Sequence, residues 1–503
     1  MKARKIIMKK LLTLLLALTM LLACVPGMAE ETAAPKYVFM FIGDGMGNPQ
    51  VAATQYYLGT LQNPDSPFPV PADLSFTSFP YLGMVTTYDA SSFCPDSAST
   101  ATSMASGEKT LSGVINYDVT LTTPFKLITE YAKEADKKIG VISSVSVDHA
   151  TPAAYYAKQP SRNDYYEIAV QGITGSTVDY LAGGGFKKPT GANKDQTDIL
   201  DLARENGWTI ANTNEEIRAL TADSGRVLAT NPVLQDSKAI HYEIDRKRLA
   251  AEGEDVLSLA DFVKAGISVL DNDNGFFMMC EGGKIDWAGH ANDAATSIQD
   301  TLALSDAVQV AVDFAAEHPD ETLIIVTADH ETGGMAIGYK TTNYDTFLTN
   351  LAHQKMSYAK FDSTYVQNYI ANKTPFEAAM QDVKANFGLT LPTDPDAANA
   401  GKLLLTDYEV ANLRTAYERT LEVGASSQSK MSQQDYELYG TYIPFSMAIC
   451  HTINHKSGMD HTTYAHTGAM VNLYAKGVGA ENFRGVFDNT EIYHKLAELT
   501  GVQ

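Results

Sequence analysis

Four short, mostly apolar runs stand out along the chain, and stretches with helical spacing separate them. The runs cover residues 37–42, 138–147, 275–280 and 323–327. Uninterrupted apolar runs of this length are typical of strands that are buried on both faces of a sheet. Helical spacing is clearest at residues 125–137 and 294–316. The alternation of strands with helices predicts an α/β fold built on a mainly parallel sheet.

Polar residues of metal-binding types follow each of the four runs. In chain order they are Asp44, then His149 and Thr151, then Glu281, then Asp329 and His330. In open α/β sheets the ligand crevice lies beyond the carboxyl ends of the strands. One such ending would be weak evidence, because Asp and Gly often end strands. Four endings together predict that these side chains meet at one edge of the sheet.

Between about residues 340 and 440 the composition shifts to Tyr, Gln, Asn, Lys and Ala. Amphipathic spacing predicts helices at 374–387 and 406–421, with Thr374 as an N-cap and Pro375 at the first helical position. Residues 391–399 have the composition of a loop. We therefore expect a mainly helical insertion at 343–440, on the surface of a catalytic core formed by residues 30–342 and 441–503.

The amino terminus has the pattern of a secretory signal peptide. Five basic residues precede an apolar run at 11–25, and 15 residues are too few for a transmembrane helix of about 20. Two endings compete. Small residues at 27–29 fit cleavage after Ala29, whereas residues 21–24 resemble a lipoprotein box that would leave a lipid anchor on Cys24. Both predict an exported protein, extracellular or in the cell envelope.

Charge and cysteine content exclude some classes of partner and site. The full chain has a formal charge of −22, and loss of residues 1–29 removes five positive charges and no negative ones. Such an acidic surface argues against binding to a nucleic-acid backbone. Beyond Cys24 the cysteines are Cys94, Cys280 and Cys450. Their odd number and wide spacing predict buried free thiols and no thiolate zinc site.

Ser97 is a candidate nucleophile. It lies in a run of small residues, 96–102, at which a helix could begin. A hydroxyl at a helix N-terminus faces main-chain N–H donors, which suits a phosphate group. Taken alone, a serine in this position is more often a helix cap. Serine also needs a base or a metal for activation, and the Gly-x-Ser-x-Gly pattern of Ser-His-Asp hydrolases is missing around Ser97.

Two further segments carry metal-ligand residues. Asp286 and His290 are four residues apart, so one helical turn would place them on the same face, where they could share a zinc ion. His466 lies near the carboxyl terminus in a His-Thr-Gly sequence. In isolation each histidine is more commonly a surface or core residue than a ligand.

The ordered set of these segments resembles the alkaline phosphatase family. The set comprises Asp44-Gly45, Asp96-Ser97-Ala98, His149-Ala150-Thr151-Pro152 with Arg162 downstream, Glu281 with Asp286 and His290, Ala328-Asp329-His330, and His466-Thr467-Gly468. The resemblance covers about residues 36–340 and 445–495. It implies a three-layer α/β/α sandwich, an enzyme that hydrolyses phosphate monoesters, and a homodimer.

The resemblance also implies a role for each matching residue, with two Zn²⁺ ions and one Mg²⁺ ion as cofactors. The first zinc would be held by Asp286, His290 and His466. The second zinc would be held by Asp44, Asp329 and His330, facing Ser97. The magnesium would be held by Asp44, Thr151 and Glu281. Ser97 would be the nucleophile, Arg162 would clamp the phosphate, and Asp96 would orient Arg162.

Several positions depart from the family pattern. His149 lies where some relatives carry Asp, and Trp287 lies where others carry Lys or His, both near the third metal site. Because imidazole favours softer ions, His149 could draw Zn²⁺ or Co²⁺ to that site. Cys94 replaces a branched aliphatic residue, which we interpret as core packing. Thr332 stands in for an outer-shell histidine.

Other members of the superfamily fit less well. The sulfatase motif Cys-x-Pro-x-Arg is missing from the sequence, and a phosphodiesterase would usually lack the phosphate-clamping arginine. A non-catalytic binder of phosphate or metal on the same fold is the alternative from a different class. Metal content and hydrolysis of a chromogenic monoester would separate it from an enzyme.

Overall fold

A ten-stranded sheet organises the chain in the computed structural model, which describes residues 34–424 and 430–501. The strand order is β14-β2-β13-β8-β1-β7-β3-β4-β6-β5. The strands are β1 (Tyr37–Gly43), β2 (Tyr81–Thr86), β3 (Lys138–Ser143), β4 (Tyr180–Gly183), β5 (Thr209–Ala211), β6 (Val227–Thr230), β7 (Phe276–Glu281), β8 (Thr322–Ala328), β13 (Val471–Gly477) and β14 (Gly485–Asp488). From β8 to β5 all neighbours are parallel, whereas β13 runs antiparallel to β8 and β2. The predicted mainly parallel sheet is confirmed.

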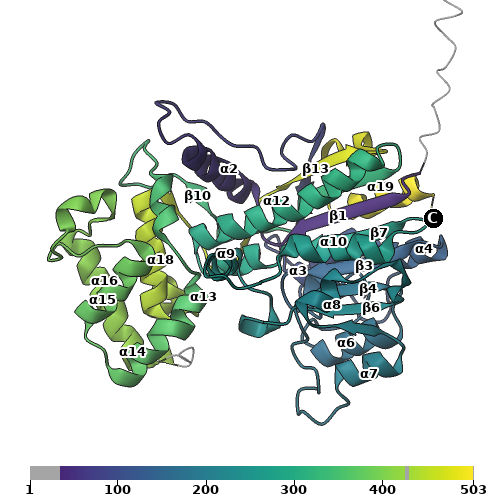
Figure 1. Cartoon of the computed structure of the whole chain (residues 1–503), viewed down its shortest axis with the longest axis horizontal. Helices are drawn as coiled ribbons and strands as arrows, with labels where there is room; N and C mark the ends of the chain where they lie inside the picture. Colours follow the sequence, from purple (N-terminus) through teal and green to yellow (C-terminus); the bar gives the residue numbers. More distant parts are fainter. Residues whose placement is uncertain (1–33, 425–429, 502–503) are drawn as a thin grey trace, which may run out of the picture. The chain divides into compact units, whose positions relative to one another are not determined.

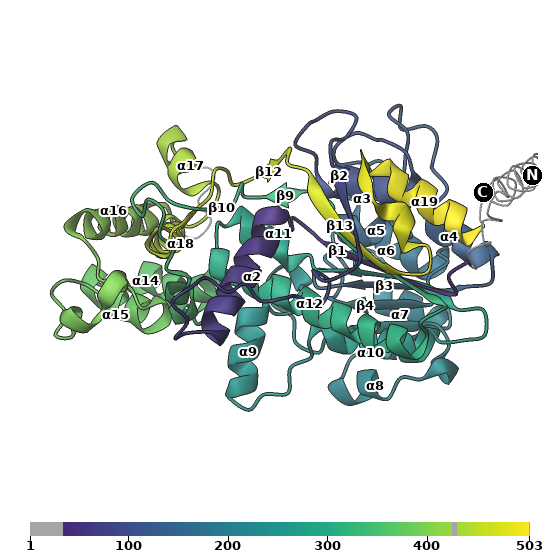
Figure 2. The same ribbon diagram turned by 90° about the horizontal axis from the view of Figure 1, so that it is seen from above.

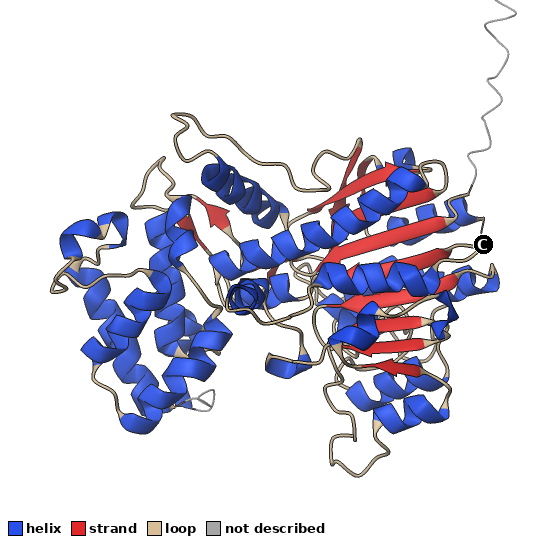
Figure 3. Cartoon of the chain, in the orientation of Figure 1, coloured by secondary structure: helices blue, strands red, loops and turns tan. Residues whose placement is uncertain are grey.

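Helices cover both faces of this sheet (Figures 1, 2 and 3). On one face lie α10 (Leu259–Leu270) and α12 (Ala294–Glu317), and on the other lie α3 (Ser97–Ser106), α4 (Ile128–Glu134) and α19 (Thr490–Thr500). The remaining core helices are α2 (Asn48–Gln62), α5 (Ala150–Ala153), α6 (Tyr165–Thr174), α7 (Ile199–Glu205), α8 (Asn214–Arg218), α9 (Glu243–Ala251) and α11 (Lys284–His290). The layers are those of the expected α/β/α sandwich.

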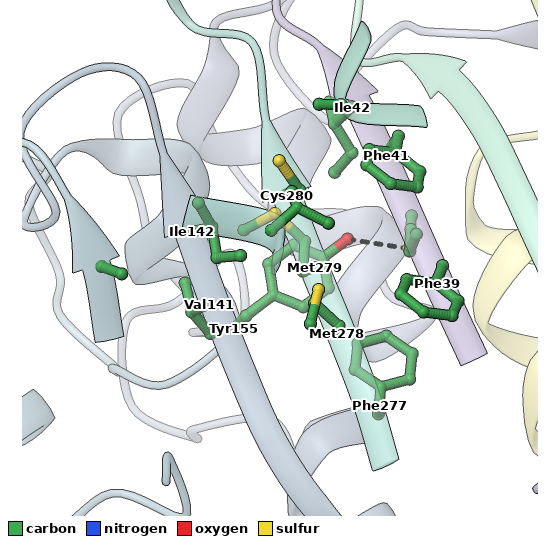
Figure 4. Packing of buried hydrophobic residues seen from close by; sticks show 14 of the residues in the cluster. Phe39, Phe41, Ile42, Val141, Ile142, Tyr155, Phe277, Met278, Met279 and Cys280 are labelled. Atoms are coloured by element: carbon green, nitrogen blue, oxygen red, sulfur yellow. Dashed lines mark hydrogen bonds between the residues drawn. The ribbon is translucent and has the colours of Figure 1, made fainter. Parts of the chain in front are cut away.

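The central strands are buried along their whole length, which explains their uninterrupted apolar sequence. Every residue of β1, β7 and β8 is buried. Phe39 packs against Phe314 of α12 on one face of the sheet, with Phe41 on the same face, whereas Tyr155 stacks on Phe277 on the other face (Figure 4). Burying apolar surface of this kind contributes about 25 cal/mol per Å². The sheet is therefore a rigid support for the residues that follow its strands.

One predicted strand is too long. The apolar run at 138–147 predicts a strand to Val147, but β3 ends at Ser143. There the Ser143 hydroxyl donates a hydrogen bond to a carboxylate oxygen of Glu281, and the Ser144 main-chain N–H donates to the Glu281 carbonyl. The chain then leaves the sheet. Val145 and Val147 are apolar because they remain buried in the core, not because they extend the strand.

The region from residue 343 to residue 440 is mainly helical, and a further helix follows it. The helices are α13 (Tyr358–Phe361), α14 (Gln367–Asn372), α15 (Phe376–Phe387), α16 (Asp407–Val423), α17 (Gln433–Tyr439) and α18 (Pro444–Ser457). All of them except α17 share a hydrophobic core that also includes Ala294, Ala295 and Ile298 of α12, whereas Tyr439 of α17 lies in a separate cluster. Figure 1 shows most of them on the side of the sheet toward which β1 points. The boundaries of the insertion remain a prediction.

The predicted helix starts had different outcomes. Thr406 caps α16, with its hydroxyl accepting from the Glu409 N–H and the Glu409 carboxylate accepting in return. The predicted cap at Thr374 is wrong. Pro375 is itself the N-cap of α15, with φ −60° and ψ 144°, and it offers no side-chain hydrogen bond. The extended ψ of Pro375 moves the helix start to Phe376.

The described cysteines are free thiols, but they are not all buried. Cys280 and Cys450 are buried as predicted, whereas Cys94 is exposed. The expectation that Cys94 serves core packing is therefore wrong, because it lies on the loop before α3 and not in the hydrophobic core.

The described helices include none that is both long enough and apolar enough to span a membrane. The predicted signal peptide, with its alternatives at Ala29 and Cys24, lies outside the described residues.

Candidate active site

The four strands that end in metal-binding residue types are neighbours in the sheet, in the order β8-β1-β7-β3. In the β1–β7 register Ile42 pairs with Glu281, and in the β1–β8 register Gly43 pairs with Ala328. Asp44, Glu281 and Asp329 consequently lie at the same edge. His149 and Thr151 follow β3, at the start of α5. All five side chains are buried.

The candidate ligands form three groups, in each of which one ligand atom per residue lies within 4.8 Å of the others. The first group is Asp286, His290 and His466. The second group is Asp44, Asp329 and His330. The third group is Asp44, His149 and Glu281, and the Thr151 hydroxyl donates to Asp44 Oδ2 at 3.4 Å beside it. Asp44 belongs to two groups, so it can bridge two cations.

The first group presents three ligand atoms to one point. Asp286 Oδ1 lies 3.3 Å from His290 Nε2 and 3.4 Å from His466 Nε2. The other nitrogen of each ring faces a main-chain carbonyl. The Tyr464 carbonyl oxygen lies 2.6 Å from His290 Nδ1, and the Pro95 carbonyl oxygen lies 2.6 Å from His466 Nδ1. A carbonyl only accepts, so each Nδ1 carries a proton, and Nε2 is the atom of each ring that can give a lone pair to a cation in exchange for its own proton. The set suits a zinc ion with an open coordination position.

Ser97 lies beside the second group, at the first residue of α3. The N-cap is Asp96, whose Oδ1 accepts from the Ser99 N–H at 3.1 Å, so Ser97 itself is not the cap. Ser97 Oγ lies 3.2 Å from His330 Nε2. The same nitrogen lies 3.4 Å from Asp44 Oδ1 and 3.2 Å from Asp329 Oδ2.

This geometry differs from that of a Ser-His-Asp triad. In a triad the carboxylate bonds to the histidine nitrogen that faces away from the serine. Here both carboxylates face the same nitrogen as Ser97, and the other nitrogen of His330 lies 3.2 Å from the Thr332 hydroxyl. That hydroxyl donates to Asp286 Oδ1 at 2.6 Å, so Thr332 links the first two groups. The arrangement fits a cation shared by serine, histidine and carboxylates.

The protonation behaviour of these groups supports the same interpretation. Burial raises the pKa of Asp44 well above its usual range, and it raises the pKa of Glu281 and of Asp329 to about 7. Burial lowers the pKa of His149 to about 3. Asp286 differs from these groups. Burial acts to raise its pKa too, but His290 and His466 outweigh that effect and hold the pKa of Asp286 well below the usual range. Buried carboxylates without a counter-charge are costly.

Each residue of the third group has a buried polar atom without a hydrogen-bond partner. Within residues 34–424 and 430–501, Asp44 Oδ1, Glu281 Oε1 and His149 Nδ1 are buried and make no hydrogen bond. Two acidic oxygens and a neutral imidazole nitrogen are the donor set of a divalent cation. The His149 ring lies 5.8 Å from the Trp287 ring. The residues of this group therefore fit a bound metal ion.

Arg162 is held by the residue that starts the serine helix. Its NH1 donates to Asp96 Oδ2 at 2.8 Å, while Asp96 Oδ1 caps α3. Burial acts against the charge on Arg162, but the Asp96 carboxylate raises its pKa, so the guanidinium stays charged. Its remaining N–H groups can bind a phosphate in two-point fashion.

The chain thus combines a serine at a helix start, an arginine beside it and three groups of candidate metal ligands. The sequence model described as "Alkaline phosphatase" matches residues 35–502. The chain belongs to the alkaline phosphatase family. The expected family and the expectation that the chain is an enzyme are confirmed.

Relatives in this family span nearly the whole chain. Alkaline phosphatase 3 of Bacillus subtilis is 30% identical over 475 residues, which cover 91% of this chain and 87% of that protein. Alkaline phosphatase 4 of the same organism is 28% identical over 480 residues, covering 92% and 88%.

Solved alkaline phosphatases share the fold. The cold-active enzyme of Shewanella sp. is 26% identical with a TM-score of 0.73, covering 92% of this chain and 99% of that one. The Thermus thermophilus enzyme is 24% identical with a TM-score of 0.74, covering 94% and 92%. A variant of the TAB5 alkaline phosphatase, in which a glutamate replaces a histidine, has Mg bound in a site called M3; it is 25% identical with a TM-score of 0.60, covering 94% and 99%.

Some partners of the site residues had no sequence signal. The carbonyls of Pro95 and Tyr464 are main-chain groups, so no residue type marks them. Ser143 contacts Glu281 from the neighbouring strand, and that contact depends on the β3–β7 register, which pairs these two residues. Only the folded chain reveals these contacts, the first two through loops and the third through neighbouring strands.

Proposed function

We propose that this member of the alkaline phosphatase family hydrolyses phosphate monoesters to an alcohol and inorganic phosphate, through a phosphoserine on Ser97, with two zinc ions and one magnesium ion. The observation that carries the proposal is the position of Ser97. Its hydroxyl lies 3.2 Å from a ligand histidine of the second group, and Asp96 joins its helix to Arg162.

Each metal ion has its own set of residues. The first zinc would be held by Asp286, His290 and His466. The second zinc would be held by Asp44, Asp329 and His330. The magnesium would be held by Asp44, Thr151 and Glu281, with His149 close by. When bound, these ions would lower the pKa of the serine hydroxyl, screen the phosphate charge and stabilise the leaving oxygen.

The residues of the chain bind and orient the reacting groups. Arg162 donates hydrogen bonds to two phosphate oxygens, and Asp96 keeps its guanidinium in place. Ser97 Oγ loses its proton and attacks phosphorus, a P–O bond to Ser97 forms, and the P–O bond to the alcohol breaks. The alcohol takes up a proton. Water then attacks the phosphoserine, which releases phosphate and restores the Ser97 hydroxyl.

The same residues favour monoesters over diesters. A monoester has three unesterified phosphate oxygens, enough for a two-point contact with Arg162 and a further contact with a bound cation, whereas a diester has only two and must lose one of these contacts. The test compares kcat/KM for p-nitrophenyl phosphate with that for bis(p-nitrophenyl) phosphate, in the presence of zinc and magnesium. We expect the monoester to be preferred by about a hundredfold or more, since losing a charged contact costs about 2–4 kcal/mol. A preference for the diester would contradict the proposal, and zinc binding without hydrolysis of either would indicate a non-catalytic binder.

Replacing His149 with aspartate is expected to shift the third site toward magnesium. A third oxygen ligand suits Mg²⁺ better than imidazole, which favours Zn²⁺ or Co²⁺. The TAB5 variants, in which a histidine is replaced by an acidic residue, hold Mg in M3 and parallel this expectation. We expect the Mg²⁺ concentration for half-activation to fall about tenfold, measured by titration alongside metal analysis of the protein. Equal responses of wild type and His149→Asp would count against a selective role for His149.

Export and assembly remain proposals. The amino-terminal pattern supports export, and mass spectrometry of the mature amino terminus would distinguish cleavage after Ala29 from lipidation at Cys24. The expected homodimer can be checked by measuring the mass of the protein in solution.

A further inference from the structure

A buried carboxylate outside the three ligand groups contacts the serine helix α3. Asp89 is on the loop that leads to α3, and only 4% of it is exposed. Three donors from its own loop converge on Oδ1: the Ser91 N–H at 2.7 Å, the Ser91 hydroxyl at 2.9 Å and the Ser92 N–H at 2.6 Å. These bonds fix the orientation of the carboxylate, so that Oδ2 is left to contact other segments.

Oδ2 of Asp89 reaches the first turn of the serine helix. The Ser99 hydroxyl lies 2.7 Å from it, and the Oδ1 and carbonyl oxygens of Asp96 are farther from that hydroxyl, at 2.9 and 3.0 Å. A serine hydroxyl has one proton to donate, and the shorter distance favours donation to Asp89. Asp96 Oδ1 still accepts from the Ser99 N–H, while Asp96 Oδ2 accepts from Arg162. Asp89 thus holds, through Ser99, the helical turn that begins with Ser97.

The same carboxylate oxygen also reaches the part of the chain that supports Arg162. We define residues 112–115 as the arginine segment. The Ser112 hydroxyl donates to the carboxylate oxygen at 2.5 Å. The next residue, Gly113, accepts a hydrogen bond from the main-chain N–H of Arg162 at 2.8 Å, and an antiparallel bridge two residues further on continues the contact. One oxygen therefore ties the arginine segment to the serine helix.

The charge of Asp89 persists although the carboxylate is buried. Burial acts to raise its pKa, but hydrogen bonds from Ser112, Ser99 and Ser91 outweigh that effect and hold the pKa of Asp89 below its ordinary value. An ionised carboxylate only accepts hydrogen bonds, so both of its oxygens can serve the donors around them. An amide has one accepting oxygen and one donating nitrogen, so asparagine in this position can satisfy only one of the two sets of donors.

We propose that Asp89 is a positioning residue for the phosphatase reaction. Its carboxylate fixes the serine helix relative to the arginine segment, so that Ser97 and Arg162 meet the same phosphate group. This inference rests on the proposed function. Asp96 contacts the Arg162 side chain directly, whereas Asp89 links the two segments of main chain that carry the reacting groups. Such a link matters because a displacement of about 1 Å between reacting groups can lower the rate about a hundredfold.

Asp89→Asn is expected to lower kcat/KM for p-nitrophenyl phosphate about tenfold or more, while zinc content stays near that of wild type. The decisive comparison repeats the substitution in an Arg162→Ala background. Once the arginine is absent, its placement relative to Ser97 no longer matters, so Asp89→Asn should cost less than about threefold there. A general loss of folded structure would lower activity by the same factor in both backgrounds, and that outcome would overturn the positioning role.

Asp118→Asn is the matched control. The Asp118 carboxylate lies in a turn of the same kind, because it accepts from the Thr122 and Thr123 N–H groups and from the Thr120 hydroxyl. The donors that the described residues provide to this carboxylate all belong to its own turn. We expect kcat/KM to stay within about twofold of wild type. A loss as large as that in Asp89→Asn would count against a specific role for Asp89.

Binding of inorganic phosphate to the zinc-loaded protein, measured by calorimetry, gives a readout that needs no turnover. We expect the phosphate Kd to rise about tenfold in Asp89→Asn. Ser112→Ala removes only the contact with the arginine segment, at an exposed residue, and should raise the phosphate Kd about threefold. This second variant decides the question if Asp89→Asn does not fold.

The two proposals fail in different ways. A wild type that binds phosphate but hydrolyses no monoester would refute the proposed function, and the phosphate Kd of the variants would still decide on Asp89. Unchanged phosphate Kd in both variants would overturn the positioning role while leaving the proposed function intact. A wild type that neither hydrolyses the ester nor binds phosphate would overturn both.

Discussion

Ser97→Ala is expected to lower the turnover of a phosphate monoester by about three orders of magnitude or more, while zinc content stays near that of wild type. The loss is large because covalent catalysis has no substitute once the nucleophile is gone, as in other hydrolases that depend on a serine. Zinc content should persist because Ser97 is in none of the three ligand groups, and among the described residues its hydroxyl forms a hydrogen bond only with His330 Nε2, at 3.2 Å. Steady-state kinetics and metal analysis on the same preparation measure both quantities.

Ser103→Ala provides the matched control on the same helix. The Ser103 hydroxyl is buried and donates to the Ser99 carbonyl one turn earlier, within α3. Its removal is expected to change turnover only slightly. Full activity in Ser97→Ala would contradict the nucleophile assignment, and loss of zinc in that variant would show that Ser97 supports the site in a different way.

Removal of metal ions by a chelator is expected to reduce activity below about 1% of wild type and to destabilise the protein in a pH-dependent way. The folded, metal-free site holds Glu281 and Asp329 with pKa values of about 7, raised by burial from ordinary values near 4. Between about pH 4 and pH 7 the folded state thus binds more protons than the unfolded state. The contribution of these two groups to the stability of the folded, metal-free protein is therefore greatest below about pH 4. It is lost as the pH rises from there through about 7.

Thermal unfolding between pH 5 and 8.5, with and without Zn²⁺ and Mg²⁺, measures this effect. The gap in melting temperature between loaded and stripped protein should widen toward pH 8, because bound cations stabilise the ionised carboxylates. Addition of the two ions to stripped protein should restore both activity and melting temperature. If the gap were constant across this pH range, the buried carboxylates would not be the metal-binding groups.

The strands and the residues that follow them could be predicted because they obey a simple physical rule. A strand buried on both faces must be apolar, and the polar residue that ends it lies at the sheet edge. Asp44, Glu281 and Asp329 follow this rule. Which strands are neighbours is not local information, since β1 pairs with β7 more than two hundred residues away. Only the resemblance to a family supplied that order.

Other features escaped prediction because the same sequence pattern fits two structures. Ser97 has the pattern of a cap, yet Asp96 is the cap, since both residue types accept from helix N–H groups. Thr374 also fits a cap, but the extended Pro375 moved the start of α15. Cys94 fits a buried thiol and is exposed.

The double use of Asp96 has a consequence for engineering. One of its oxygens fixes the first turn of the serine helix, and the other fixes the guanidinium of Arg162. The nucleophile Ser97 and the phosphate-binding Arg162 are therefore positioned by the same carboxylate, and the orientation of one cannot be changed without changing the other. A designer who moves this chemistry to another scaffold must transfer the helix start, the arginine loop and the carboxylate between them as a unit.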